Sequence, residues 1–265
     1  MTGFPSFSGK SLGAFLEPER MPSPLMNIYE TRRLLDEYLL FHYAAPQEIL
    51  PWAQGPQEAL NFAVRSVTQL ADFSLQPRTA LDLGCAVGRS SFELARHCDV
   101  VLGIDYSHSF IDAAQALKQG SLAYERLDEA TLRTALTATA PADCPRERVQ
   151  FETGDAMNLR ADLGSFDLVH GANLLCRLPE PHLLLERLPE LVKPGGQLLL
   201  TTPCTWLEEF TPRGQWPQGS TLDWLKETLS THFDLVKQED LPFLIREHAR
   251  KYQWSVALGT RWTRH

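Results

Sequence analysis

The fold is indicated most clearly by one stretch of sequence, Thr79-Ala-Leu-Asp-Leu-Gly-Cys-Ala-Val-Gly-Arg-Ser-Ser91. A short apolar run gives way to small residues and then to an amphipathic segment, which predicts a strand, a tight loop and a helix. Gly84 permits a turn that a Cβ would obstruct. Ala86 and Gly88 have small side chains or none, which leaves the backbone N–H groups of the loop accessible to a ligand. We therefore expect a polar ligand to bind at this loop.

A second acid completes the expected ligand site. Asp105 ends the next predicted strand, 17 residues after Gly88, where a carboxylate can bind two ribose hydroxyls. The pattern Asp-x-Gly-x-Ala-x-Gly is not a dinucleotide fingerprint, because Ala86 stands at the middle glycine position. Taken with Gly154-Asp-Ala156, the strand, loop, helix and acid resemble the class I S-adenosylmethionine-dependent methyltransferases.

Composition favours a soluble protein that acts on a small molecule. The chain has 265 residues and 43% hydrophobic content, enough for a large core with an additional arm. A net charge of −8 argues against nucleic acid as a partner, since such binding needs a basic surface. The five cysteines include no C-x-x-C pair, so we expect reduced thiols and no metal site. Without a leader or a membrane-length apolar run, the expected location is cytoplasmic, away from membranes.

An N-terminal arm is expected to precede the core. Residues 1–25 are rich in Pro, Ser and Gly and predict a flexible lead. Residues 26–74 predict a helical arm, whose first helix would start with a capping box formed by Asn27 and Glu30 and run to about Tyr43.

Aromatic side chains with polar heads gather on this first predicted helix. Tyr38 and His42 lie one turn apart, and Tyr43 follows directly. Two interpretations explain these residues equally well. The helix could pack on the core with the polar groups of these side chains hydrogen-bonded, or it could form a lid that covers a substrate. The two interpretations stay open at this point.

The core, residues 75–265, alternates predicted strands with predicted helices. The expected strands are residues 79–83, 100–104, 148–153, 166–171 and 197–202. This alternation predicts an α/β, Rossmann-like sheet, mostly parallel with helices on both faces. Residues 254–260 are expected to pair antiparallel with 233–238 and to complete seven strands. The insertion at about 119–147 is too long for an ordinary connection and is predicted to be partly helical around residues 129–138.

Four residues outside the loop are candidate substrate contacts. Asn173 follows a predicted strand at the edge where ligands of α/β sheets bind; its amide could hold a heterocycle or only satisfy a turn. Trp206 and Glu209 share a proline-bounded loop, and aromatic rings beside acids suit a cationic small molecule. Arg246 could bind a carboxylate through two parallel hydrogen bonds.

Four blocks of sequence resemble one narrow family. They are Tyr38-Leu-Leu-Phe-His-Tyr43, Asp82-Leu-Gly-Cys-Ala-Val-Gly88, Thr205-Trp-Leu-Glu-Glu-Phe-Thr-Pro212 and Phe243-Leu-Ile-Arg-Glu-His-Ala-Arg-Lys-Tyr-Gln-Trp254. The blocks look like the methyltransferase of ovothiol biosynthesis, which is either the C-terminal domain of ovothiol synthase or a free-standing 4-mercaptohistidine N1-methyltransferase. The resemblance covers approximately residues 27–262.

The resemblance implies methylation of a ring nitrogen of 5-thiohistidine, the last step of ovothiol biosynthesis. A neutral imidazole nitrogen already carries a lone pair, so alignment and choice of tautomer should matter more than a strong base. The implied roles are ring orientation for His42, Tyr43 and Asn173, walls of the site for Tyr38 and Trp206, ammonium binding for Glu209, and carboxylate binding for Arg246.

The cofactor implied by the resemblance is S-adenosylmethionine, which leaves as S-adenosylhomocysteine. Its implied binding residues are Asp82, Gly84, Cys85, Ala86 and Gly88 at the loop, Asp105 at the ribose, and Tyr106, Asp155 and Ala156 at the adenine. The alanine at position 86 adds only a methyl group and is not expected to abolish binding.

Two other functions remain open from the sequence. The chain could methylate another small amine, a thiol or a protein histidine, or it could be a non-catalytic S-adenosylmethionine-binding partner of a sulfur-inserting enzyme. Nothing in the sequence resembles the metal-binding sulfoxide synthase half of ovothiol synthase, so this chain is expected to carry methylation only, alone or in association with such a synthase. The methylated nitrogen and the oligomeric state are not defined by the sequence.

Overall fold

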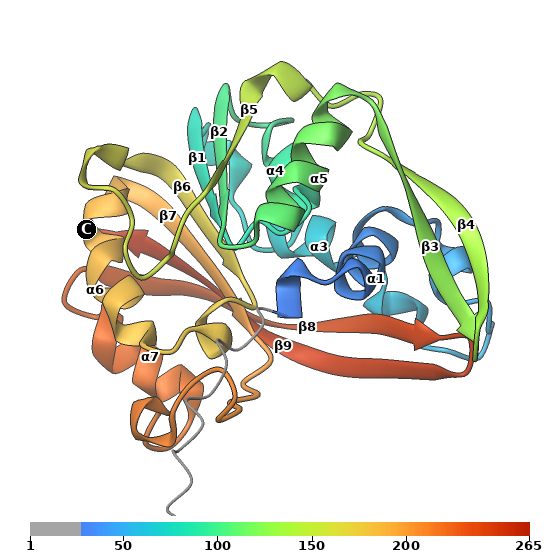
Figure 1. Cartoon of the computed structure of the whole chain (residues 1–265). Coiled ribbons are helices and arrows are strands. Elements are labelled where there is room, and N and C mark those ends of the chain that lie inside the picture. Colours follow the sequence, from blue (N-terminus) through green and yellow to red (C-terminus); the bar gives the residue numbers. More distant parts are fainter. Residues whose placement is uncertain (1–27) are drawn as a thin grey trace, which may run out of the picture.

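A seven-stranded sheet forms the centre of the computed structural model, which describes residues 28–265 (Figure 1). The predicted flexible lead, residues 1–25, and the predicted cap at Asn27 lie outside the described residues. The strands are β1 (Thr79–Leu83), β2 (Val100–Asp105), β5 (Val149–Thr153), β6 (Phe166–Ala172), β7 (Val192–Thr202), β8 (Phe233–His248) and β9 (Lys251–Arg264). Their order is β5-β2-β1-β6-β7-β9-β8, and β9 alone runs in the direction opposite to the other six strands. This arrangement confirms the predicted Rossmann-like sheet.

Helices cover both faces of the sheet, and each face has its own apolar core (Figure 1). One layer contains α3 (Phe62–Thr68), α4 (Arg89–Leu94) and α5 (His108–Gln119); the other contains α6 (Pro181–Leu191) and α7 (Thr221–Leu229). Ala80 of β1 packs in the first core, whereas Leu81 packs in the second. Because both faces are covered, β1 reads as a nearly continuous apolar run rather than an alternating one.

The N-terminal arm packs on the first layer. It consists of η1 (Ile28–Glu30), α1 (Arg32–Tyr43), α2 (Pro46–Ile49) and η2 (Gln57–Ala59). The predicted helix start was wrong, because α1 begins at Arg32 and Thr31 is its N-cap. Glu30 does not cap its own helix and instead accepts hydrogen bonds from the start of α5, where unpaired N–H groups are available.

The insertion is a β-hairpin, so its predicted helical character was wrong. Strands β3 (Ser121–Glu129) and β4 (Leu132–Thr139) pair antiparallel around a turn at Ala130, which has a φ of +50°. In β4, Thr134, Leu136 and Ala138 turn toward the protein while the intervening residues face solvent. This alternation with a period of two is typical of a strand with one covered face.

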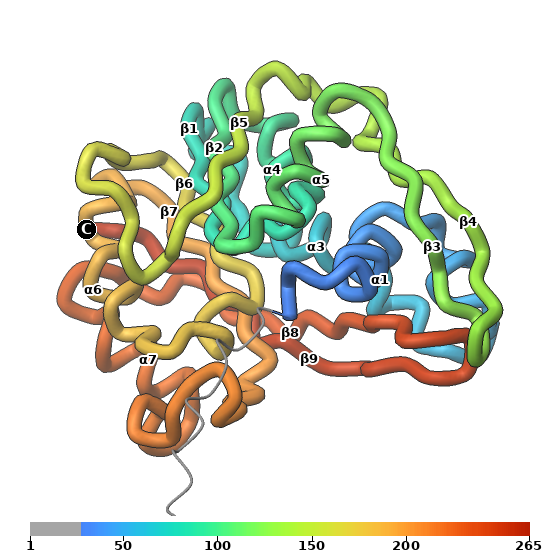
Figure 2. The backbone as a smooth tube through the Cα atoms, viewed as in Figure 1, coloured from blue at the N-terminus to red at the C-terminus, as the bar shows by residue number. Residues whose placement is uncertain are grey.

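The last two strands extend beyond the sheet as a long ribbon. The predicted antiparallel pairing of the last two strands is confirmed, but its register was wrong: residues 233–238 pair with 260–264, and residues 254–260 pair with 238–244. The strands are also longer than predicted, with 16 residues in β8 and 14 in β9. The ribbon reaches the β3–β4 hairpin, where Ala249 N donates to Asp128 O at 3.0 Å. Helix α1 lies between the ribbon and the hairpin (Figures 1 and 2).

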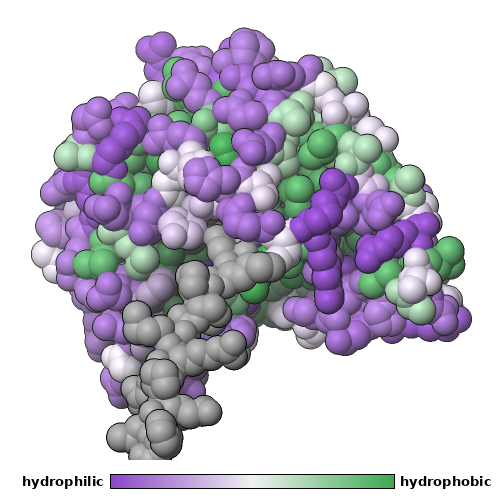
Figure 3. Space-filling view, in the orientation of Figure 1, coloured by the Kyte–Doolittle hydropathy of each residue, from purple (hydrophilic) through white to green (hydrophobic). Residues whose placement is uncertain are grey.

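The apolar sides of the arm and ribbon turn inward. Leu39 and Leu40 of α1 share a core with Leu241, Phe243 and Leu244 of the ribbon. On the face shown in Figure 3, apolar residues appear as small patches between hydrophilic ones. None of the helices in residues 28–265 has the length and apolarity required to cross a membrane.

Candidate cofactor and acceptor site

The loop between β1 and α4 has the backbone conformation that its small residues predict. Gly84 and Gly88 have φ values of +67° and +84°, and a Cβ at Gly88 would lie 2.6 Å from the Phe151 ring. Gly84 N donates to Ile104 O at 2.8 Å, which ties the loop to the end of β2. Ala86 also has a positive φ, +49°, a conformation that costs an alanine about 1 kcal/mol. The loop therefore accepts local strain at its middle position.

Asp105 lies against this loop, as predicted. Its Oδ2 accepts the Ala86 N–H at 2.8 Å and its Oδ1 accepts the Ser107 N–H at 2.9 Å. Burial raises the pKa of Asp105 to about 6, opposed by these backbone hydrogen bonds and assisted by the negative charges of Asp82 and Glu30. Tyr106 is 65% exposed beside it, so an acid and an open aromatic ring adjoin the loop.

Asp82 supports the loop from beneath rather than facing outward. It is 1% exposed, and its Oδ2 accepts the hydroxyls of Ser90 and Ser91 at 2.7 and 2.6 Å. Its Oδ1 faces Nδ1 of His170 at 2.7 Å, and Nε2 of His170 faces Ser66 Oγ at 3.1 Å. The carboxylate is thus occupied by protein groups that fix the start of α4. Sequence reasoning missed this network; its only signal was a histidine inside an otherwise apolar strand.

Of the remaining predicted cofactor residues, Asp155 and Ala156 follow the end of β5, and Cys85 belongs to the loop after β1. Gly154 N donates to Asp105 O at 2.9 Å, which places the end of β5 beside the end of β2. Asp155 Oδ1 accepts the Met157 N–H at 2.9 Å, and Ala156 is buried. Cys85 is also buried, which raises the pKa of its thiol well above the usual range. This thiol is therefore not a reactive group.

Helix α1 docks directly on the loop. Tyr43 Oη donates to Val87 O at 2.6 Å. The Tyr38 ring packs 4.6 Å from Phe110 and stacks 5.7 Å from His42. Burial, with the nearby Arg89 cation, lowers the pKa of His42 to about 3, so its imidazole is neutral at pH 7. Its buried Nδ1 has no hydrogen-bond partner among the described residues.

Glu30 fastens the arm next to Asp105. Its carboxylate accepts the N–H groups of His108 and Ser109 at 2.9 and 3.1 Å and the Ser109 hydroxyl at 2.6 Å. In addition, Ser107 Oγ donates to Tyr29 O at 3.0 Å. A carboxylate at the positive end of a helix is favourable. The arm is therefore held at the start of α5, only a few residues after Asp105.

Asn173 also lies close to the loop. Its backbone has a φ of +53°, and its Oδ1 accepts the Thr201 hydroxyl at 2.9 Å. The next residue, Leu174, packs on Gly84, where an added Cβ would lie 3.1 Å from a Leu174 methyl group. Asn173 thus satisfies a turn, and its Nδ2 donates no hydrogen bond within the described part of the chain.

The two candidates after β7 differ in their surroundings. The Trp206 indole donates to Thr221 Oγ1 at 3.1 Å and packs edge-on against Trp224 at 5.7 Å. These contacts fix Trp206 on α7. Glu209 is exposed. The structure therefore gives Trp206 a packing role, while ammonium binding by Glu209 stays a prediction.

A cavity of about 510 Å³ lies between the end of α1, the start of α4 and residues 139–146; neither residues 84–88 nor Asp105 are among its lining residues. Its lining includes His42, Tyr43, Arg89 and Arg146, so the α1 residues predicted for the acceptor border open space next to the start of α4. No group of three potential metal-ligating side chains occurs in the part of the chain that the structure describes.

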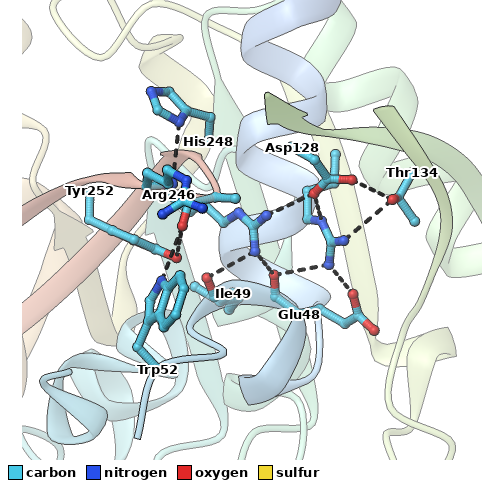
Figure 4. A network of polar contacts seen from close by, with 11 residues as sticks. Glu48, Ile49, Trp52, Asp128, Thr134, Arg246, His248 and Tyr252 are labelled. Atoms are coloured by element: carbon cyan, nitrogen blue, oxygen red, sulfur yellow. Dashed lines mark hydrogen bonds and ion pairs between the residues drawn. The ribbon is translucent and has the colours of Figure 1, made fainter. Parts of the chain in front are cut away.

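Arg246 is not brought together with these residues. It is 4% exposed and lies where β8, the β3–β4 hairpin and α2 meet (Figure 4). Its Nη2 pairs with Asp128 Oδ1 at 2.8 Å, and its Nη1 donates to Glu48 O at 2.8 Å. Arg126 shares Asp128 and also pairs with the Glu48 carboxylate. Arg246, which was predicted to bind a substrate carboxylate, is thus already paired with Asp128 of the insertion.

The strand order, with its one antiparallel strand, and the loop facing Asp105 define the class I S-adenosylmethionine-dependent methyltransferase fold. Residues 56–248 match the model of the methyltransferase domain family. The chain belongs to this family.

Curated relatives align over part of their length. A ubiquinone biosynthesis O-methyltransferase of Coxiella burnetii is 27% identical over 129 residues, 49% of this chain and 45% of the relative. Phosphoethanolamine N-methyltransferase 3 of Arabidopsis thaliana is 26% identical over 125 residues, 47% of this chain and 21% of the relative. The chain therefore spans less than half the length of these relatives.

Solved structures share the fold over most of the chain. One is magnesium protoporphyrin IX methyltransferase from Synechocystis PCC 6803 with bound S-adenosylmethionine. It superposes with a TM-score of 0.53 at 19% sequence identity, and the match covers 87% of this chain and 90% of that enzyme's chain. Another is the N-methyltransferase NodS from Bradyrhizobium japonicum WM9 in complex with S-adenosylhomocysteine. Its TM-score is 0.51 at 18% sequence identity, and the match covers 87% of this chain and 98% of the NodS chain.

The raised pKa of Asp105 predicts a pH-dependent cofactor affinity. The sequence predicts that the ionised Asp105 carboxylate accepts hydrogen bonds from the ribose hydroxyls. With a pKa of about 6, protonation would then compete with binding below that pH. Affinity for S-adenosylhomocysteine should be nearly constant above about pH 7 and fall about tenfold for each pH unit below about 6. Calorimetric titrations between those limits measure this dependence; an affinity independent of pH would contradict it.

Proposed function

We propose that this chain transfers a methyl group from S-adenosylmethionine to a ring nitrogen of 5-thiohistidine, the last step of ovothiol biosynthesis. The observation that carries the proposal is the docking of the Tyr38–Tyr43 block on the cofactor loop through the hydrogen bond from Tyr43 to Val87 O. This block is among those that resemble the ovothiol methyltransferases, and its His42 and Tyr43 line the cavity next to the start of α4.

The residues at the loop fit the proposed cofactor. The loop offers a backbone of small residues between Gly84 and Gly88, and Asp105 with the exposed Tyr106 ring lies beside it. Asp105 would hold the ribose, and Asp155 the adenine. When bound, S-adenosylmethionine supplies a methyl group on a positively charged sulfur. Asp82 acts indirectly in this proposal, because its hydrogen bonds to Ser90 and Ser91 hold the loop and the start of α4 in place.

The chain contributes orientation and exclusion of water rather than a strong base. His42 is neutral, and its buried Nδ1 has no hydrogen-bond partner among residues 28–265. In this proposal, that nitrogen accepts the N–H of an imidazole and selects the reactive tautomer. The Nδ2 of Asn173 can donate to the same ring. Tyr38 and Phe110 supply apolar walls, and excluding water there favours dispersal of the sulfonium charge as the methyl group moves.

A product assay tests the proposal. The chain is incubated with S-adenosylmethionine and either 5-thiohistidine or histidine, and the products are fragmented by mass spectrometry. One added methyl group on the ring of thiohistidine is expected, with little product from histidine. Methylation of histidine or of another amine without turnover of thiohistidine would show a different methyltransferase. Binding of S-adenosylhomocysteine without turnover of any acceptor would favour a non-catalytic binder.

A further inference from the structure

Arg177 lies one turn after the residue that covers the cofactor loop. It ends η6 (Leu175–Arg177), and its backbone N–H donates to Leu174 O at 2.8 Å. Leu174 is the residue that packs on Gly84, and Asn173 directly precedes it. The segment after β6 therefore places an arginine beside the acceptor residues that the sequence predicted, although the run Leu-Leu-Cys-Arg has no motif that would identify it.

The guanidinium of Arg177 lies beside two aromatic rings that come from distant segments of the chain. Its Cζ is 4.6 Å from the centre of the Phe210 ring, and the Tyr29 ring is 6.4 Å from Phe210. Burial raises the pKa of Tyr29, and the Arg177 guanidinium opposes that rise both as a nearby cation and through a side-chain hydrogen bond with Tyr29. Three segments far apart in the sequence thus meet at this guanidinium.

No carboxylate of the described residues pairs with Arg177. Its Nη1 donates to Cys176 O at 3.3 Å and weakly to Thr205 O at 3.5 Å, whereas the buried Arg246 has Asp128 as an ionic partner. Its side chain also hydrogen-bonds Tyr29. A guanidinium has five N–H donors, more than these contacts use, and stacking on the Phe210 ring holds the remaining donors in a fixed plane. Arg177 therefore has both the charge and the orientation to receive an anion.

We propose that Arg177 binds the α-carboxylate of the acceptor amino acid, an inference that rests on the proposed function. The two oxygens of a carboxylate match the donors on one edge of the guanidinium. Phe210 holds the plane of that edge, and the surrounding rings reduce screening by water. Arg177 then has the role that the sequence assigned to Arg246 and selects amino acids over amines that lack the carboxylate.

The test compares thiohistidine with its decarboxylated amine in wild type and in Arg177→Gln. The substitution is expected to raise KM for thiohistidine about 30-fold and to leave KM for the amine within about twofold. The control is Arg213→Gln, which removes another arginine–ring contact, 5.6 Å from Trp216, and should change neither KM. Affinity for S-adenosylhomocysteine, measured by calorimetry, should stay near the wild-type value in both variants.

Two results would overturn the assignment: an equal rise in KM for both compounds, which means that Arg177 only positions the arm around Tyr29, or no rise for thiohistidine. Failure of the proposed function is recognised separately, because the wild type would then methylate neither compound. In that case the same comparison is made by equilibrium binding to the protein loaded with S-adenosylhomocysteine. Preference for thiohistidine over the amine, lost in Arg177→Gln, would support carboxylate binding even without turnover, and equal binding would reject it.

Discussion

Asp105→Asn is expected to weaken binding of S-adenosylhomocysteine by about 100-fold or more, because hydrogen bonds to an ionised carboxylate contribute about 1.5–3 kcal/mol each. An asparagine also turns an NH₂ group toward Ala86 N or Ser107 N, both of which donate to Asp105 in the native protein. The variant should lose the pH dependence of affinity below about pH 6 as well. Calorimetry at several pH values measures both effects.

The matched control for this prediction is Asp112→Asn. Asp112 is an exposed acid on α5, so its neutralisation changes net charge equally without touching the loop. Its affinity should equal that of the wild type. A cofactor affinity unchanged in Asp105→Asn, with the fold intact by circular dichroism, would remove Asp105 from the binding site.

Arg246→Met is expected to destabilise the protein by about 3 kcal/mol, since it removes one member of a buried ion pair together with its hydrogen bonds. The carbonyl of Glu48 loses its donor at 2.8 Å and keeps only the longer one from Arg126 at 3.3 Å, while Asp128 keeps Arg126. For a chain of this size, the midpoint of thermal unfolding should fall by roughly 6–12 °C. Differential scanning calorimetry measures the shift.

A surface arginine of the same ribbon provides the comparison. Arg250→Met changes an exposed residue at the turn between β8 and β9, and its unfolding midpoint should remain within about 1–2 °C of wild type. Should Arg246→Met instead keep the native midpoint and raise KM for thiohistidine, the buried network would not be its main role, and substrate binding by Arg246 would be restored.

The sheet and the cofactor loop were predictable because their signals are local. The run from Thr79 to Ser91 contains the strand, the turn residues and the helix start in consecutive positions, and the same holds for Asp105 at the end of β2. The conformation of such segments depends little on tertiary partners. A continuous apolar run is typical of a buried parallel strand, and a tight turn with positive φ is adopted readily only by glycine.

The errors concern residues whose role depends on distant partners. Residues 129–138 contain alanine, leucine and threonine, which suit a helix or a strand, and pairing with β3 decides the outcome. Arg246 was assigned to the substrate because nothing near it in sequence reveals Asp128. Conversely, Arg177 was missed because its aromatic neighbours, Tyr29 and Phe210, come from the arm and from the loop after β7.

The position of β9 between β7 and β8 has a consequence for synthesis of the chain. Residues 197–202 of β7 pair with residues 258–263 of β9, so that edge of β7 stays open until the later segment has left the ribosome. An open, apolar strand edge is a template for pairing with other chains, and contacts between such distant positions form slowly. Translation that stops before residue 258 should therefore yield an aggregating product rather than a shorter working domain.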